Sequence, residues 1–192
     1  MADKIDVPNV MTPKFRVSFP NVFRPGKPVD PTKAGKYSVT MLFDKDANLE
    51  PLKKAMVDFM TKKFGGNQAS WPKLSRNPFR DQGEKTFEGY VAGAKFINAT
   101  SNTKPGLVDA QNNDIINEAD FYPGCYARAT VRPFWYDTAG NKGVAFGLQN
   151  IQKLADGEPL GGRVSASKAF EPVAPAGGGG SDTAKTAADL FG

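Results

Sequence analysis

Hydrophobic and polar residues alternate in two segments near the beginning of the chain, residues 14–19 and 36–43. A period of two is typical of a β-strand with one buried face. The residues between the two segments are rich in Pro and Gly and are predicted to form a loop. We therefore expect two strands with the following side chains inward: Phe15, Val17, Phe19, Tyr37, Val39, Met41 and Phe43.

The period changes in residues 44–66, where hydrophobic residues recur at spacings of three and four. This pattern predicts an amphipathic α-helix. Asp46 or Asn48 is a possible N-cap, and Pro51 suits the first turn. The glycines that follow Phe64 are predicted to end the helix. We expect its apolar stripe to pack on a sheet, and the stripe consists of Leu52, Met56, Phe59, Met60 and Phe64.

Further strands are predicted in residues 89–101, 125–136 and 143–154, with a short one in 106–111. The last two long segments flank "DTAGNKG", a Gly/Asn turn that predicts a β-hairpin. Several strands, one helix and long loops indicate a small barrel or sandwich. The strand count fits a mainly β fold, a five-stranded OB-fold Greek-key barrel with one inserted α-helix and long loops.

The composition changes toward the C-terminus. Residues 165–192 are rich in Gly, Ala and Pro and include four consecutive glycines, Gly177 to Gly180. Such a run does not hold a regular element. The sequence thus predicts a folded domain in residues 1–164, followed by a flexible linker and tail in residues 165–192.

The composition also limits the chemistry of the chain. Its 192 residues include no histidine, which removes His general bases and His-containing metal sites. The single cysteine allows no internal disulfide. The net charge of +5 favours a polyanionic partner. We see no secretory signal and no membrane span, so we expect a cytoplasmic protein without a cofactor or metal.

The segment of residues 125–136 has two different faces if it is a strand. One face is small and apolar and ends in Trp135. The other alternates rings with guanidinium groups and should lie outside, because two unpaired arginines are too costly to bury. Exposed rings can stack on bases, and arginines can neutralise phosphates. This predicts a nucleic-acid-binding face made of Tyr126, Arg128, Arg132, Phe134 and Tyr136.

Two alternatives remain open for this strand. Arg128 and Arg132 could pair with carboxylates of a neighbouring strand, with the rings packed under a loop. Pro133 lacks a backbone donor and favours bulges. A bulge there would turn Trp135 to the arginine face and Phe134 and Tyr136 inward, so Trp135 is a reserve candidate for the binding site.

A second candidate region is the loop "WPKLSRNPFRDQGEK", residues 71–85. It interleaves rings and cations, a composition that could grip a strand against a groove. Its candidate binding residues are Arg76, Phe79 and Arg80, and Lys95 and Lys142 could extend a basic track. The alternative is a solvated loop with a ring or two tucked beneath it.

Four segments together resemble a family of tailed-phage single-stranded DNA-binding proteins with an OB-fold. They are "KYSVTMLFDK", "NATSNTKPGLVD", "FYPGCYARATVRPFWYDTAGNKGVAFGLQNIQKL" and "DGEPLGGR". The resemblance implies a non-catalytic protein that coats single-stranded DNA during replication and recombination in an infected bacterial host. It also implies a tail that contacts replication or recombination proteins. Duplex DNA or RNA could be weaker partners. In this chain the tail candidates are Asp189, Leu190 and Phe191.

The sequence is also compatible with two other functions. The aromatic strand could be a protein interface of a virion or assembly protein. Asp and Glu side chains could instead bind a divalent metal in a nuclease.

Overall fold

The computed structural model describes residues 5–161 and 170–173. Contacts divide the chain into Met1–Gly162 and Arg163–Gly192. The boundary predicted near residue 164, and most of the predicted linker and tail, lie outside the described residues. No described helix is long and apolar enough to cross a membrane.

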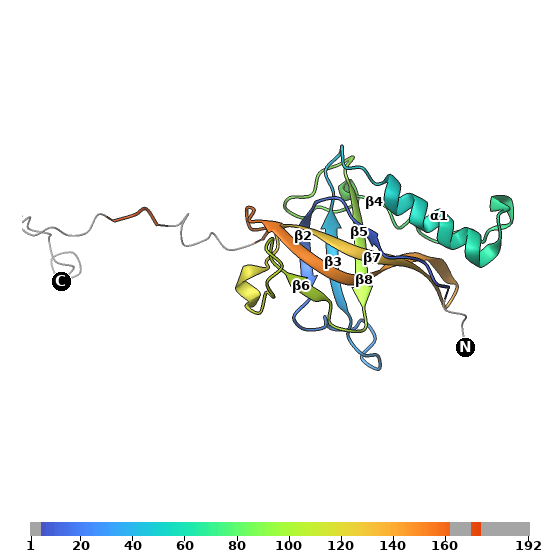
Figure 1. The fold of residues 1–192 in the computed structure, drawn as a ribbon, viewed down its shortest axis with the longest axis horizontal. Coiled ribbons are helices and arrows are strands. Elements are labelled where there is room, and N and C mark those ends of the chain that lie inside the picture. Colours follow the sequence, from blue (N-terminus) through green and yellow to red (C-terminus); the bar gives the residue numbers. More distant parts are fainter. Residues whose placement is uncertain (1–4, 162–169, 174–192) are drawn as a thin grey trace, which may run out of the picture. The chain divides into compact units, whose positions relative to one another are not determined.

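The described residues form eight strands in one mixed sheet, rather than the five predicted, and one α-helix (Figure 1). Three of these strands have only two or three residues. The elements are β1 (Val10–Met11), β2 (Phe15–Asn21), β3 (Tyr37–Leu42), α1 (Glu50–Phe64), β4 (Arg80–Asp81), β5 (Lys95–Ser101), β6 (Gly106–Val108), β7 (Tyr126–Thr138) and β8 (Asn141–Ala155).

The five long strands close into a ring in the order β2-β3-β5-β8-β7, and β7 pairs again with β2. All neighbouring pairs in this ring are antiparallel except β5 and β8, which run parallel. The ring encloses a core of alternating strand residues, as the period of two predicted, including Phe15, Val17, Val39, Met41 and Phe146.

Phe19 is an exception, because its ring is 53% exposed rather than inward. Ser18 pairs with Thr40 and Asn21 with Ser38, so β2 has one extra residue at this point. Such a bulge reverses the direction of the side chains beyond it. The sequence prediction for Phe19 was therefore wrong, while Phe15 and Val17 are buried as expected.

The helix α1 ends at Gly65, whose φ of 88° suits a residue without a Cβ. The N-cap is Leu49, whose side chain makes no capping hydrogen bond, so the prediction of Asp46 or Asn48 at this position was wrong. Asn48 lies one residue earlier and accepts a hydrogen bond from the Glu50 N–H at 3.1 Å. Leu52, Phe59 and Met60 of the predicted stripe are buried. The helix covers the part of the β7–β8 hairpin that extends beyond the ring (Figure 1).

Candidate nucleic-acid interface

The strand β7 separates its side chains as the alternation predicted. Ala127, Ala129 and Val131 are buried, whereas Arg128 is exposed. Pro133 pairs with Phe146 in unbroken register. The bulges of the hairpin lie in β8, for example at Gln149, because Thr130 pairs with Asn150 and Val131 with Leu148. The alternative of a bulge at Pro133 is therefore wrong.

On the outer face of the hairpin, small residues of β8 stand opposite the rings of β7. Tyr136 pairs with Gly143, and Phe134 pairs with Ala145. A Cβ on Gly143 would lie only 2.7 Å from the Tyr136 hydroxyl oxygen, so the ring lies directly over this glycine. A Cβ on Gly147 would lie 3.7 Å from Cδ1 of Phe134. Both rings are half-buried, and each keeps a surface toward solvent.

Tyr136 and the loop before β4 form one pocket of about 150 Å³. Arg76 of the loop, Arg80 of β4, Asn98 of β5 and Ala145 of β8 line it with Tyr136. The structure thus brings together three of the predicted binding residues from segments far apart in sequence. A ring beside two guanidinium groups can stack a base while the cations face its phosphates.

The two arginines of this pocket differ in their partners. Arg80 donates two hydrogen bonds to the Glu84 carboxylate, at 3.0 and 2.6 Å, and its guanidinium carbon lies 4.9 Å from the centre of the Phe96 ring. The hydrogen bond from Arg80 lowers the pKa of Glu84. No carboxylate of the described residues lies within 4.0 Å of Arg76, which keeps its charge free for an anion.

Arg128 and Arg132 contact amides instead of carboxylates. Arg128 Nε donates to the Gln152 side-chain oxygen at 2.8 Å, and Arg132 Nε donates to Asn9 Oδ1 at 3.1 Å. No salt bridge to either arginine occurs among the described residues. The alternative of carboxylate pairing is therefore wrong, and no carboxylate of the described residues offsets the charge of either guanidinium group.

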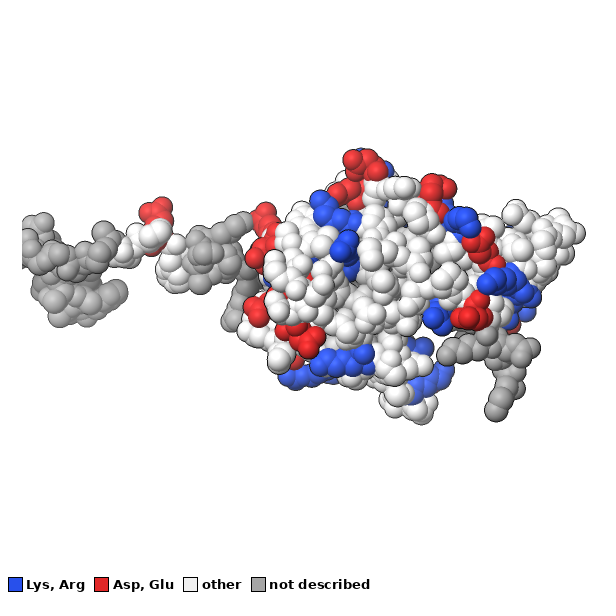
Figure 2. Space-filling model, viewed as in Figure 1, with Lys and Arg blue, Asp and Glu red and all other residues white. Residues whose placement is uncertain are grey.

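Both lysine candidates are paired with carboxylates. Lys95 Nζ lies 3.3 Å from Asp81 Oδ2, and Lys142 Nζ lies 3.5 Å from Asp137 Oδ2 at the tip of the hairpin. Backbone N–H groups, first that of Gly93, lower the pKa of Asp81. In the view of Figure 2, Lys and Arg alternate with Asp and Glu around the rim, while uncharged residues cover much of the middle.

Comparison with known proteins identifies the family. Residues 8–179 match the family described as "Enterobacter phage Enc34, ssDNA-binding protein". The chain belongs to this family. The family resemblance predicted from the sequence is therefore confirmed. A relative, protein p50 of Acyrthosiphon pisum secondary endosymbiont phage 1, is 29% identical over 171 residues, covering 84% of this chain and 91% of p50.

Two solved structures show the same fold. The single-stranded DNA-binding protein of bacteriophage Enc34 in complex with ssDNA has a TM-score of 0.63 at 21% identity, covering 80% of this chain and 89% of that one. The single-stranded DNA-binding protein gp2.5 of bacteriophage T7 has a TM-score of 0.56 at 12% identity, covering 90% and 100%.

Three of the aromatic candidates, Tyr126, Phe79 and Trp135, do not line the Tyr136 pocket. Tyr126 lines another pocket with Arg16, and Lys14 Nζ is 5.3 Å from its ring centre. Phe79 is only 9% exposed and packs edge-on against Phe146, so its ring cannot stack on a base. Trp135 lies on the opposite face of the hairpin, 5.0 Å from the Phe64 ring of α1.

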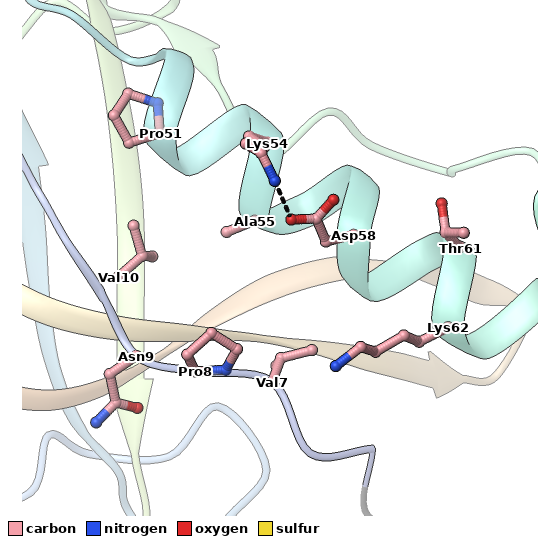
Figure 3. Close-up of a pocket in the computed structure, with 10 residues that line it drawn as sticks. All are labelled: Val7, Pro8, Asn9, Val10, Pro51, Lys54, Ala55, Asp58, Thr61 and Lys62. Atoms are coloured by element: carbon pink, nitrogen blue, oxygen red, sulfur yellow. Dashed lines mark hydrogen bonds and ion pairs between the residues drawn. The ribbon is translucent and has the colours of Figure 1, made fainter.

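A larger groove, of about 590 Å³, separates α1 from the N-terminal segment (Figure 3). Figure 3 shows Val7, Pro8 and Val10 facing Ala55 across it. Lys54 at its rim is neutralised by Asp58 at 2.6 Å. No aromatic ring lines this groove, so it does not share the chemistry of the Tyr136 pocket.

Sequence reasoning missed the floor of the interface, which consists of Asn98, Gly143, Ala145 and Gly147. A signal was present, since small residues occupy every second position in "GVAFG". That pattern marks a strand face on which another group lies close to the backbone.

Proposed function

We propose that this protein binds single-stranded DNA without sequence preference and without catalysis. The observation that carries the proposal is the Tyr136 pocket, where a ring over a glycine floor lies beside Arg76 and Arg80. Membership of the Enc34 ssDNA-binding protein family supports it, as does the fold shared with an Enc34 protein solved with ssDNA.

The ring of five long strands is, in this proposal, an OB-fold barrel. The order β2-β3-β5-β8-β7, closed by a parallel β5–β8 pair, supports this assignment. The short strands β1, β4 and β6 are then additions at its edges. In OB-folds the face of the second and third barrel strands binds oligonucleotides, and here that face belongs to β3 and β5.

The proposed mechanism has two parts. Arginines attract the backbone and displace its counterions, which makes binding depend on salt. Phe134 and Tyr136 then offer ring surfaces to successive bases, and each stacked base contributes about 1–3 kcal/mol whatever its identity. The rings contribute to affinity more than the cations do at high salt, because only the cationic part is screened.

A titration of oligo-dT, duplex DNA and RNA at several salt concentrations tests the proposal. We expect oligo-dT to bind most tightly and the logarithm of affinity to fall linearly with the logarithm of salt concentration. Absence of binding, or binding that ignores salt, would refute it. Self-assembly without nucleic acid would favour the assembly protein, and specific cleavage with Mg²⁺ or Mn²⁺ would favour the nuclease.

The biological setting is part of the proposal. The protein would act in the cytoplasm of an infected bacterium and would protect DNA during replication and recombination, a role that its membership of a phage ssDNA-binding protein family supports. Asp189, Leu190 and Phe191 would contact replication or recombination proteins. These residues lie outside the described part of the chain, so deletion of residues 187–192 and a pull-down of replication proteins test this role separately from DNA binding.

A further inference from the structure

A second pair of rings is exposed on the outer side of the barrel. Phe19 is 53% exposed and Phe87 is 49% exposed, and their ring centres lie 5.1 Å apart in an edge-to-face arrangement. None of the binding residues predicted from the sequence belongs to this pair. Exposed rings that contact each other form an apolar patch, which on a soluble protein often marks a binding site.

The backbone holds Phe19 in this position at an energetic cost. Its φ is 43°, in the left-handed region that bulky residues rarely adopt. The bulge of β2 imposes this conformation and turns the ring toward solvent. Strain of this kind persists only where the surrounding structure imposes it, and it clusters at ligand-binding sites.

The loop that carries Phe87 is fixed to the barrel. Gln82 is 2% exposed, donates to the backbone oxygens of Phe43 and Lys95, and accepts from the Val91 N–H. The Tyr90 hydroxyl lies 3.0 Å from Ser18 Oγ on β2. Phe87 thus lies between two points at which the loop is attached to the barrel, and its ring contacts that of Tyr90.

This ring pair is connected with the Tyr136 pocket in two ways. The first is a row of ring contacts. The ring centres of Phe87 and Tyr90 lie 5.4 Å apart, and those of Tyr90 and Phe96 lie 6.0 Å apart. The guanidinium group of Arg80, which lines the pocket, lies over the Phe96 ring. The strands give the second connection. Ser18, next to Phe19, pairs with Thr40, and Thr40 donates to Asn98 of the pocket at 2.8 Å.

A basic pocket adjoins Phe19 and indicates an anionic ligand. Asn21 donates to the Phe19 carbonyl oxygen at 3.5 Å and lines a pocket of about 600 Å³ with Lys27, Lys33 and Lys36. Asp30 lies 3.9 Å from Lys33. Within the described residues no carboxylate lies within 4.0 Å of the other two lysines.

We propose that Phe19 and Phe87 form a second stacking site for the same DNA strand. This inference rests on the proposed function. The strand leaves the Tyr136 pocket, crosses the outer faces of β5 and β3 at Asn98 and Thr40, and places a further base on the ring pair. Its backbone passes the pocket of Lys27 and Lys36.

Oligonucleotides of two lengths test this path with the full chain. We expect Phe19→Ala/Phe87→Ala to weaken binding of oligo-dT of about 12 nucleotides by roughly 5- to 150-fold, the loss of one stacked base. The affinity for oligo-dT of about 4 nucleotides should change less than 2-fold, because an oligonucleotide of this length fills the Tyr136 pocket and does not reach the ring pair. Phe87→Leu, which keeps an apolar side chain without a ring, should also lose affinity for the longer oligonucleotide.

Ile116→Ala is the matched control, because Ile116 is also a large exposed hydrophobic residue, at 86% exposure, and has no ring that could stack on a base. It should leave both affinities unchanged. Equal binding of the longer oligonucleotide by the wild type and the Phe19→Ala/Phe87→Ala variant would overturn the second site but not the proposed function. If the wild type binds neither oligonucleotide, the proposed function itself fails.

A photochemical readout locates the base directly. A single 5-iododeoxyuridine is placed near one end or the other of the longer oligo-dT. At one end it should crosslink to the peptide that contains Phe19 or Phe87, and at the other end to the peptide that contains Tyr136. Crosslinks confined to the Tyr136 end would overturn the second site. The second site is established if the wild type crosslinks from both ends and the Phe19→Ala/Phe87→Ala variant loses only the crosslink to its own peptide.

Discussion

The two faces of the β7–β8 hairpin use aromatic rings for opposite purposes. On the inner face Trp135 and Val144 pack against α1, and Trp135 contacts Phe64 edge-on. On the outer face Phe134 and Tyr136 lie over small residues of β8, and neither ring belongs to the described cluster that packs on α1. Trp135 thus stabilises the fold, whereas its neighbours Phe134 and Tyr136 on the same strand face the proposed DNA.

The difference lies in what stands across from each ring. Side chains of α1 cover part of the inner ring, so this part of its surface is removed from water and contributes to folding. Glycine and alanine support the outer rings from below and leave one side open. An open ring held flat by the backbone is already positioned for a base, which reduces the entropy lost on binding.

The largest expected effect is on the inner face. Trp135→Ala should lower the free energy of unfolding by about 3 kcal/mol, because it removes a large ring from the contact with α1. Urea denaturation measures this change, and Trp135→Phe should lose much less. Unchanged stability with lost DNA affinity would instead place Trp135 in the binding site.

On the outer face Tyr136→Ala should weaken oligo-dT binding by roughly 5- to 150-fold, the value of one stacked base. The free energy of unfolding should change less than in Trp135→Ala. Fluorescence anisotropy measures the affinity, and Tyr136→Phe, which keeps the ring, is the control. A loss of affinity in Tyr136→Phe as large as that in Tyr136→Ala would argue against stacking.

The floor of the outer face offers a more selective test. Gly143→Ala adds a Cβ that would lie 2.7 Å from the Tyr136 hydroxyl oxygen, so the ring must tilt. We expect oligo-dT affinity to fall by about 5-fold, as for a partly lost stack. Gly66→Ala is the matched substitution, because its Cβ meets nothing within 4 Å. Equal affinities of these two variants would contradict the role of the floor.

The contribution of each cation to the salt dependence of DNA binding should depend on whether a carboxylate already pairs with it. Arg76→Ala should reduce the slope of log affinity against log salt by about 1, since Arg76 has no carboxylate partner among the described residues. Lys142→Ala should change the slope less, because Asp137 already neutralises Lys142 at 3.5 Å. Salt titrations of both variants decide this, and equal slopes would count against it.

The smallest effect is expected along β7. Arg132 is two residues from Phe134 on β7, whereas Arg128 is six residues from Phe134 and donates a hydrogen bond to Gln152. Arg132→Ala should therefore reduce the salt slope, and Arg128→Ala should reduce it less. A larger effect of Arg128→Ala would move the path of the DNA backbone toward Tyr126.

Several features of the fold followed from local patterns. The alternation in β3 and β7 predicted their buried faces, and the spacing of three and four predicted α1. Local patterns could not reveal the bulge at Phe19 or the position of Phe79, whose ring fills the core beside Phe146. The first depends on how β2 pairs with β3, and the second on how a loop closes over the barrel.

The sequence by itself determined which residues of β7 share a face, because the pleat of a strand fixes the period of two. It also determined the family, the helix and the absence of histidine chemistry. Only the tertiary structure decided what covers each face. It placed α1 over Trp135, brought Arg76 and Arg80 to Tyr136, and exposed Phe19 with Phe87. These contacts join residues far apart along the chain, and local periodicity contains no information about them.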